Sequence, residues 1–182
     1  MASIDITKSA TIDASAERVW QILGEEFLDV ARWASSVDHA TDNPLAVTGP
    51  EAAPTNGRSC TIAGFGQTDE RLVAFDPTRR TLAYTATADK LPRFVRGMRN
   101  DWVVETTGPS RARVTTQITA QATGLMGAIA APMMRMKLRT TQRQILDDLR
   151  TYAETGSPSK AKLKAQGAAA RRRVQPKPAA AK

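Results

Sequence analysis

Residues 98–122 read MRNDWVVETTGPSRARVTTQITAQA, and this stretch decides the fold. Two runs rich in β-branched and aromatic residues, Met98–Thr106 and Val114–Ala122, flank the turn-forming tripeptide Gly108-Pro109-Ser110. A short turn between two such runs joins strands that run antiparallel. The segment therefore predicts a β-hairpin.

Further strand-like runs precede this hairpin: one lies near the start of the chain, and the others continue the same pattern back to about residue 37. The clearest are Ser3–Ile12, Cys60–Phe65, Arg71–Phe75 and Leu82–Ala88. Asp76-Pro77-Thr78-Arg79 suits a type I turn with proline in its second position. The spacing predicts an antiparallel meander.

Helical patterns occur on both sides of these strands. Two short helices are predicted over about 15–24 and 27–33, the first with Ser15 as its N-cap. A long helix is predicted over about 124–154, with Gly156 as its stop and Pro132 expected to end, kink or start a segment of it. Its apolar stripe comprises Met134, Leu138, Thr141, Ile145, Leu149 and Tyr152. The order predicts an α+β fold: a curved antiparallel sheet of about seven strands around the C-terminal helix.

The positive charge of the chain is concentrated at its end. Of 26 Lys and Arg residues, eight lie in residues 157–182, which contain no acid; the 18 that remain equal the 18 Asp and Glu residues. The net charge of +8 therefore belongs to the tail. With few large apolar residues, the tail is expected to be disordered, which predicts a folded domain over 1–156 and a basic tail over 157–182.

Several classes of protein are excluded by composition. A single Cys and a single His leave no internal disulfide and no structural zinc site, and we expect neither metal nor cofactor. No apolar stretch approaches the roughly 18 residues of a membrane span, and Met1–Asp5 carries no signal-peptide pattern. We expect a cytoplasmic protein.

The order of these motifs resembles the START-like SRPBCC superfamily, specifically its polyketide cyclase/dehydrase and lipid-transport branch, over residues 1–156. The resemblance lies in segments 12–20, 70–77, 80–84, 100–105 and 145–154. It implies the helix-grip fold, in which the sheet and the long helix enclose an apolar cavity. It transfers no fixed catalytic motif, because its members include enzymes, lipid carriers and toxins.

Few residues suggest catalysis by their type. His39, the only imidazole, and Tyr84 are weak candidates for moving protons, with a structural role for His39 the commoner interpretation. Cys60 is expected to be a buried, unreactive thiol. Adjacent acids such as Asp69-Glu70 and Asp147-Asp148 do not face each other on a regular element, so we expect solvated charges there.

A ligand cavity is the more informative expectation. Alternation places Met98, Asn100 and Trp102 on one face, together with equivalent residues of the neighbouring strands. Such a mixture of apolar side chains and sparse polar groups is typical of small-molecule pockets, although a filled core uses the same residues. The predicted ligand-binding residues are Phe65, Tyr84, Met98, Asn100, Trp102, Thr116, Ile118, Met134 and Leu138.

Three functions stay open at this point. The first is binding of a hydrophobic small molecule or lipid, and the second is a polyketide cyclase or dehydratase, so the sequence leaves open whether the protein is an enzyme. The third is an interaction protein whose tail binds nonspecific nucleic acid, ribosomes or an anionic membrane. The tail residues proposed for such contacts are Lys160, Lys162, Lys164, Arg171, Arg172, Arg173, Lys177 and Lys182.

Overall fold

The computed structural model describes residues 2–174. All seven strands form one antiparallel sheet in the order β1-β7-β6-β5-β4-β3-β2, so the first strand pairs with the last. The strands are β1 Ala2–Ile12, β2 Val37–Asp42, β3 Gly57–Ile62, β4 Gly66–Asp76, β5 Thr81–Ala88, β6 Val95–Gly108 and β7 Arg111–Ala122. The predicted hairpin is confirmed as β6–β7, in which Asn100 lies opposite Ile118 and Trp102 opposite Thr116.

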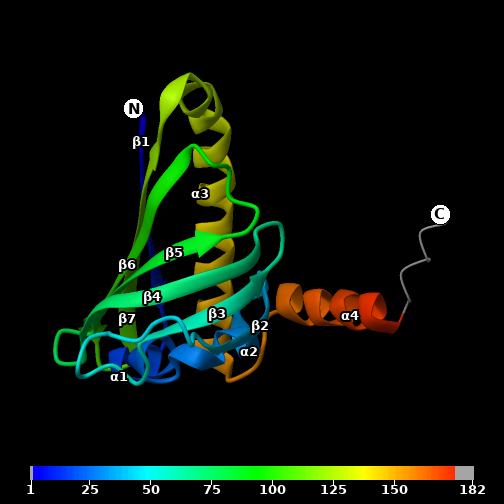
Figure 1. Ribbon diagram of the computed structural model, residues 1–182. Coiled ribbons are helices and arrows are strands. Elements are labelled where there is room, and N and C mark those ends of the chain that lie inside the picture. Colours follow the sequence, from blue (N-terminus) through cyan, green and yellow to red (C-terminus); the bar gives the residue numbers. More distant parts are fainter. Residues whose placement is uncertain (1, 175–182) are drawn as a thin grey trace.

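The helices lie on one face and at one end of this sheet (Figure 1). The long helix α3 runs along the sheet, and the short helices between β1 and β2 close the base. The helical segments are α1 Ala16–Trp20, η1 Gln21–Glu25, η2 Phe27–Asp29, α2 Val30–Trp33, α3 Gly124–Thr155 and α4 Lys160–Val174. This arrangement confirms the predicted helix-grip fold.

Local signals set the ends of the helices as expected. The Ser15 side chain accepts a hydrogen bond from the backbone N–H of Arg18, which is an N-cap. At the C-terminal end of α3, Gly156 adopts a left-handed conformation and its backbone N–H donates to the carbonyl of Tyr152, which terminates the helix. Both expectations are confirmed.

Pro132 neither ends nor starts a segment of α3, which corrects two of the three predicted outcomes; a kink at Pro132 stays a prediction. The helix is continuous from Gly124 to Thr155, with Pro132 inside it. Pro132 has no N–H to offer to the carbonyl of Ala128. Because both residues are exposed, water can bind that carbonyl, and the helix loses little by continuing.

The start of α3 lies unusually close to the sheet. A Cβ atom added at Gly127 would lie 2.7 Å from the carbonyl carbon of Ala122 in β7, closer than any side chain allows. Ala131, one turn later, is also buried. Small residues on this side of the helix therefore fix how near α3 approaches β7.

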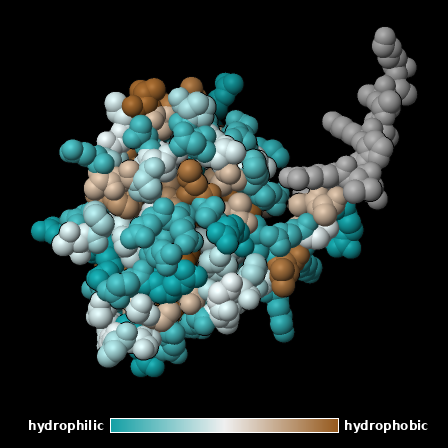
Figure 2. Space-filling model, turned by 90° about the horizontal axis from the view of Figure 1, so that it is seen from below, coloured by the Kyte–Doolittle hydropathy of each residue, from teal (hydrophilic) through white to brown (hydrophobic). Residues whose placement is uncertain are grey.

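The tail prediction is corrected where the structure describes it. Residues 160–174 form helix α4 rather than a disordered segment, and α4 projects from the body of the molecule (Figures 1 and 2). The segment is rich in Ala, Lys and Arg, which all favour helix, a tendency that the sequence argument left out. Residues 175–182, including Lys177 and Lys182, lie outside the described residues.

The first turn of α4 is anchored to the domain. The Ser159 hydroxyl donates to the Asp148 carboxylate and accepts from the Lys162 backbone N–H, which caps the helix. The Lys162 ammonium donates to the Val37 carbonyl over 2.6 Å and is buried. Burial lowers the pKa of Lys162, while Asp38 and Asp148 oppose this shift. Lys162 is thus a structural contact and is removed from the predicted anionic-surface residues.

Candidate functional site

An internal cavity of about 100 Å³ lies between the sheet and α3. Strands β3 to β7 form one wall, α3 forms the other, and α2 with the start of β2 closes the base. The lining is mostly apolar, with a minority of polar groups. The main lining residues are Val30, Ser36, Val37, Arg58, Ile62, Phe65, Thr68, Glu70, Tyr84, Ala86, Met98, Asn100, Ile118, Leu138, Thr141, Gln142 and Ile145.

A second, larger chamber of about 370 Å³ adjoins this inner cavity. Phe65, Met98 and Leu138 line both spaces, which therefore meet at these three side chains. The outer chamber lies between the β5–β6 connection and the first half of α3, and its only charged lining groups are Lys90 and Lys137. We refer to the two spaces as the inner cavity and the outer chamber.

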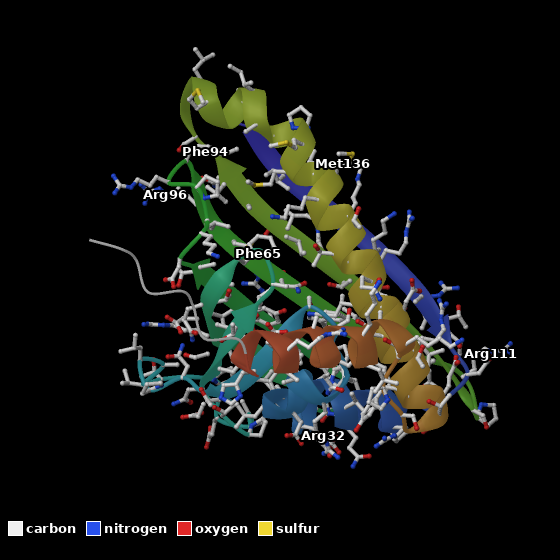
Figure 3. All side chains as sticks on the ribbon, turned by 90° about the vertical axis from the view of Figure 1, so that its right-hand side faces the viewer. Arg32, Phe65, Phe94, Arg96, Arg111 and Met136 are labelled. Atoms are coloured by element: carbon white, nitrogen blue, oxygen red, sulfur yellow. The ribbon has the colours of Figure 1, made fainter. Side chains whose placement is uncertain are left out.

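Phe65 reaches this boundary from a tight turn rather than from a strand. The predicted strand Cys60–Phe65 ends at Ile62, and residues 63–65 turn the chain into β4. Gly64 and Gly66 both have positive φ, a conformation that favours glycine and places Phe65 between them. The Lys137 ammonium lies 4.5 Å from the Phe65 ring centroid, which links the turn to α3 (Figure 3).

A buried ion pair lies in the wall of the inner cavity. Arg58 on β3 lies opposite Glu70 on β4, and its Nε donates to the Glu70 carboxylate over 2.6 Å. The Arg58 Nη1 also donates to the Phe27 carbonyl, and the guanidinium stacks 3.9 Å from the Phe27 ring centroid. Burial lowers the pKa of Arg58, but the Glu70 carboxylate, together with Cys60 and Tyr84, more than offsets this, and the net pKa is raised. The two charges cancel inside the wall.

Next to this ion pair, three polar side chains form a hydrogen-bonded chain across β5, β6 and β7. The Thr116 hydroxyl donates to the Asn100 amide oxygen over 2.8 Å, and the Asn100 amide nitrogen donates to the Tyr84 hydroxyl over 2.9 Å. Burial, and secondarily the Glu70 carboxylate, raises the pKa of Tyr84. Tyr84 therefore keeps its proton at neutral pH and can donate it.

Two polar atoms at the cavity have no hydrogen-bond partner among the described residues: the Thr68 hydroxyl and the Gln142 amide oxygen. Both residues are almost fully buried. The Gln142 amide nitrogen donates to the carbonyls of Ile6 and Thr116, and since only an N–H can face two carbonyls, the amide orientation is fixed. A buried polar group without a partner costs about 1–3 kcal/mol, which a bound molecule could offset.

The predicted ligand-binding residues divide into three groups. Phe65, Tyr84, Met98, Asn100, Ile118 and Leu138 line the inner cavity, and Met134 lines the outer chamber. Trp102 lies below the cavity against a void of about 10 Å³. Thr116 is fully buried and does not line the cavity, but it is hydrogen-bonded to two residues that do, Asn100 and Gln142.

The weak catalytic candidates are not brought together. His39 is exposed on the edge strand β2 and lines none of the pockets, whereas Tyr84 lies in the inner cavity. Cys60 is fully buried, and burial raises the pKa of its thiol to about 12, as an unreactive core residue requires.

Several polar groups of the cavity were not predicted from the sequence. Glu70 and Asp148, predicted as solvated, are 4% and 1% exposed because Arg58 and Ser159 respectively bind their carboxylates. Thr68 and Glu70 point to one face of β4 and Asp69 to the other. Once the pairing register of β3 and β4 is known, Arg58 lies opposite Glu70. No sequence signal identified Gln142, which lies among apolar residues of α3.

No described helix is both long and apolar enough to cross a membrane. No group of three or more His, Cys, Asp or Glu side chains within residues 2–174 is placed to hold a metal ion.

Comparisons with solved structures identify the fold. The chain is similar to a START superfamily protein from Mycobacterium smegmatis, with 11% identity, a TM-score of 0.65, and coverage of 84% of this chain and 99% of that one. It is also similar to the protein XoxI from Bacillus cereus, with 18% identity, a TM-score of 0.65, and coverage of 83% and 94%. The di-domain ARO/CYC BexL of the BE-7585A biosynthetic pathway matches with 15% identity and a TM-score of 0.62, over 81% of this chain and 47% of BexL.

Sequence comparison gives the family. No curated protein matches the chain by sequence. The profile of the family described as polyketide cyclase / dehydrase and lipid transport matches residues 3–154, nearly the whole domain that encloses the two chambers. The chain therefore belongs to the polyketide cyclase / dehydrase and lipid transport family.

Proposed function

We propose that the chain binds an amphipathic small molecule, with an apolar body in the outer chamber and a hydrogen-bonding end in the inner cavity. The observation that carries this proposal is the pair of unpartnered atoms, the Thr68 hydroxyl and the Gln142 amide oxygen, at the end of an apolar space. The outer chamber has the volume of a small-molecule pocket, roughly 300–1,000 Å³. Family membership supports the same class of function.

The polar groups define the chemistry of the bound end. The Gln142 amide oxygen can only accept, so the ligand should present a donor to it. Tyr84 and Thr68 can donate to an oxygen on the same group. Because Arg58 and Glu70 neutralise each other, a charged group on the ligand would gain little binding free energy there. A hydroxyl group, alcohol or phenol, satisfies all three conditions.

Calorimetry with a naphthol and with its methyl ether tests this proposal. The two probes have similar shapes, but only the naphthol can donate to Gln142. We expect the naphthol to bind at least about tenfold more tightly, the value of one well-placed hydrogen bond in a dry site. Equal affinities, or no binding of either probe, would contradict the proposal.

The substitution Thr68→Val removes one unpartnered atom with little change of shape. We expect it to weaken naphthol binding while the methyl ether binds as before. Thr61→Val, an exposed change on β3, is the matched control and should alter neither affinity.

The cavity favours binding over cyclase or dehydratase chemistry. The raised pKa of Tyr84 keeps it protonated, and exposed His39 is not available to a molecule in the cavity.

Contact of the tail with nucleic acid stays a prediction. Of the tail side chains that the structure describes, Lys160, Lys164 and Arg171 are exposed. A cytoplasmic location also stays a prediction.

A further inference from the structure

The first half of α3 exposes an apolar stripe to solvent. Its members share the helix face turned away from the sheet, and each is at least 66% exposed: Leu125, Met126, Ile129, Met133 and Met136. They are five of the ten large apolar side chains exposed among the described residues. Spacings of three and four residues place them side by side. We call this set the apolar stripe.

The stripe ends within the same helix. Beyond Met136 the solvent-facing residues are polar or charged, namely Arg139, Thr140, Arg143 and Asp147. The base of the molecule, seen in Figure 2, is mostly hydrophilic with small apolar areas. Exposure of large apolar side chains is therefore concentrated at one end of the molecule, and such a patch marks an interaction site.

Basic residues outnumber acids at this end of the molecule, where Asp5 and Asp89 are also exposed. Residues 90–98 and 121–137 contain Lys90, Arg93, Arg96, Arg135 and Lys137, and neither segment contains Asp or Glu. The two segments are adjacent, because Val95 pairs with Ala122 and the Thr123 N–H donates to the Phe94 carbonyl. Figure 3 shows Phe94, Arg96 and Met136 in the upper part of the molecule, with Arg32 and Arg111 at the base.

The same end contains the outer chamber. Met133 belongs to the apolar stripe and also lines the outer chamber. Lys90 and Lys137 line it from the β5–β6 connection and from α3. Whatever covers the stripe therefore lies against the wall of the chamber.

The charge pattern selects the kind of partner. A second copy would bring the same net basic surface into a symmetric interface, where like charges repel. Nucleic acid would bind the basic groups through phosphates but would leave the apolar stripe in water. An anionic bilayer satisfies both features, since helices of this type insert apolar side chains at the interface while Lys and Arg contact lipid headgroups.

We propose that the apolar stripe and its five basic neighbours dock the protein on anionic membranes with the outer chamber against the bilayer. This docking does not depend on which molecule the cavity binds. The wild-type chain should float with vesicles of phosphatidylcholine containing about one-third phosphatidylglycerol, and should bind pure phosphatidylcholine vesicles at least about tenfold more weakly. High salt should weaken the binding.

Two pairs of variants test the two components. Leu125→Ser with Ile129→Ser shortens the stripe, and Leu45→Ser with Val47→Ser is its control at similarly exposed sites elsewhere. Arg93→Glu with Arg96→Glu reverses the basic rim, and Arg71→Glu with Arg79→Glu makes the same change in net charge elsewhere. We expect each test pair to reduce vesicle binding at least about tenfold relative to its control.

Circular dichroism and the urea midpoint check that the variants fold. Equal vesicle binding by test and control pairs would overturn the proposal. So would a dimer in sedimentation that the stripe variant dissociates, or duplex DNA binding that is tighter than vesicle binding and independent of the stripe.

Discussion

The inner cavity and the outer chamber share Phe65, Met98 and Leu138 but differ in almost every other physical respect. The inner cavity is small and ends in an ion pair, a hydrogen-bonded chain and two unpartnered atoms. The outer chamber is larger and apolar, with lysines among its lining residues. The two spaces therefore suit different roles in the proposed function. The polar groups of the inner cavity can discriminate between ligands, whereas the walls of the outer chamber provide apolar contact area.

The largest expected effect concerns the ion pair of the inner cavity. Glu70→Leu leaves the Arg58 guanidinium buried without its counter-ion, which should lower the free energy of unfolding by about 3–5 kcal/mol. Urea denaturation measures this. The double variant Arg58→Met with Glu70→Leu should recover most of the loss, because no isolated charge remains.

Asp13→Ala is the matched control for this comparison. It breaks the exposed Arg111–Asp13 pair and should cost less than about 1 kcal/mol. A loss from Glu70→Leu no larger than that of Asp13→Ala would show that the Arg58 charge is not held in a buried site.

The next prediction compares two residues of α3 one turn apart. Leu138 is 5% exposed and lines both the inner cavity and the outer chamber, so Leu138→Ala should cost about 2–3 kcal/mol. Met134 faces only the outer chamber and is half-buried, so Met134→Ala should cost about 1 kcal/mol or less. Equal losses in thermal and urea unfolding would mean that the outer chamber is packed as tightly as the core.

The smallest expected effect on the free energy of unfolding comes from replacing each of two threonines, Thr116 and Thr68, with valine. Thr116→Val removes the donor to Asn100 and should cost about 1 kcal/mol. Thr68→Val removes a hydroxyl that has no partner among the described residues, so in the ligand-free protein it should be neutral or slightly stabilising. Losses of similar size in urea denaturation would show that Thr68 already has a partner.

Periodicity predicted the fold and the apolar walls. Alternation along β6 placed Met98 and Asn100 on the cavity side, and the spacing of α3 placed Leu138 opposite them. The ion pair of the cavity was not predicted, because Arg58 and Glu70 meet only once the register of β3 and β4 is known. The anchoring of α4 was missed for a similar reason: Lys162 reaches Val37 across 125 residues, a contact that no local pattern contains.

The close approach of α3 to β7 at Gly127 has a consequence for how this scaffold can change. The side chains at the mouth sit on the turns that follow Gly127, so the helix carries them together. A single methyl group at position 127 would clash with the backbone of Ala122 and force α3 or β7 to move, so we expect the outer chamber to change shape although Gly127 does not line it. We therefore expect the backbone clearance at position 127 to set part of the dimensions of the outer chamber from a position that does not line it.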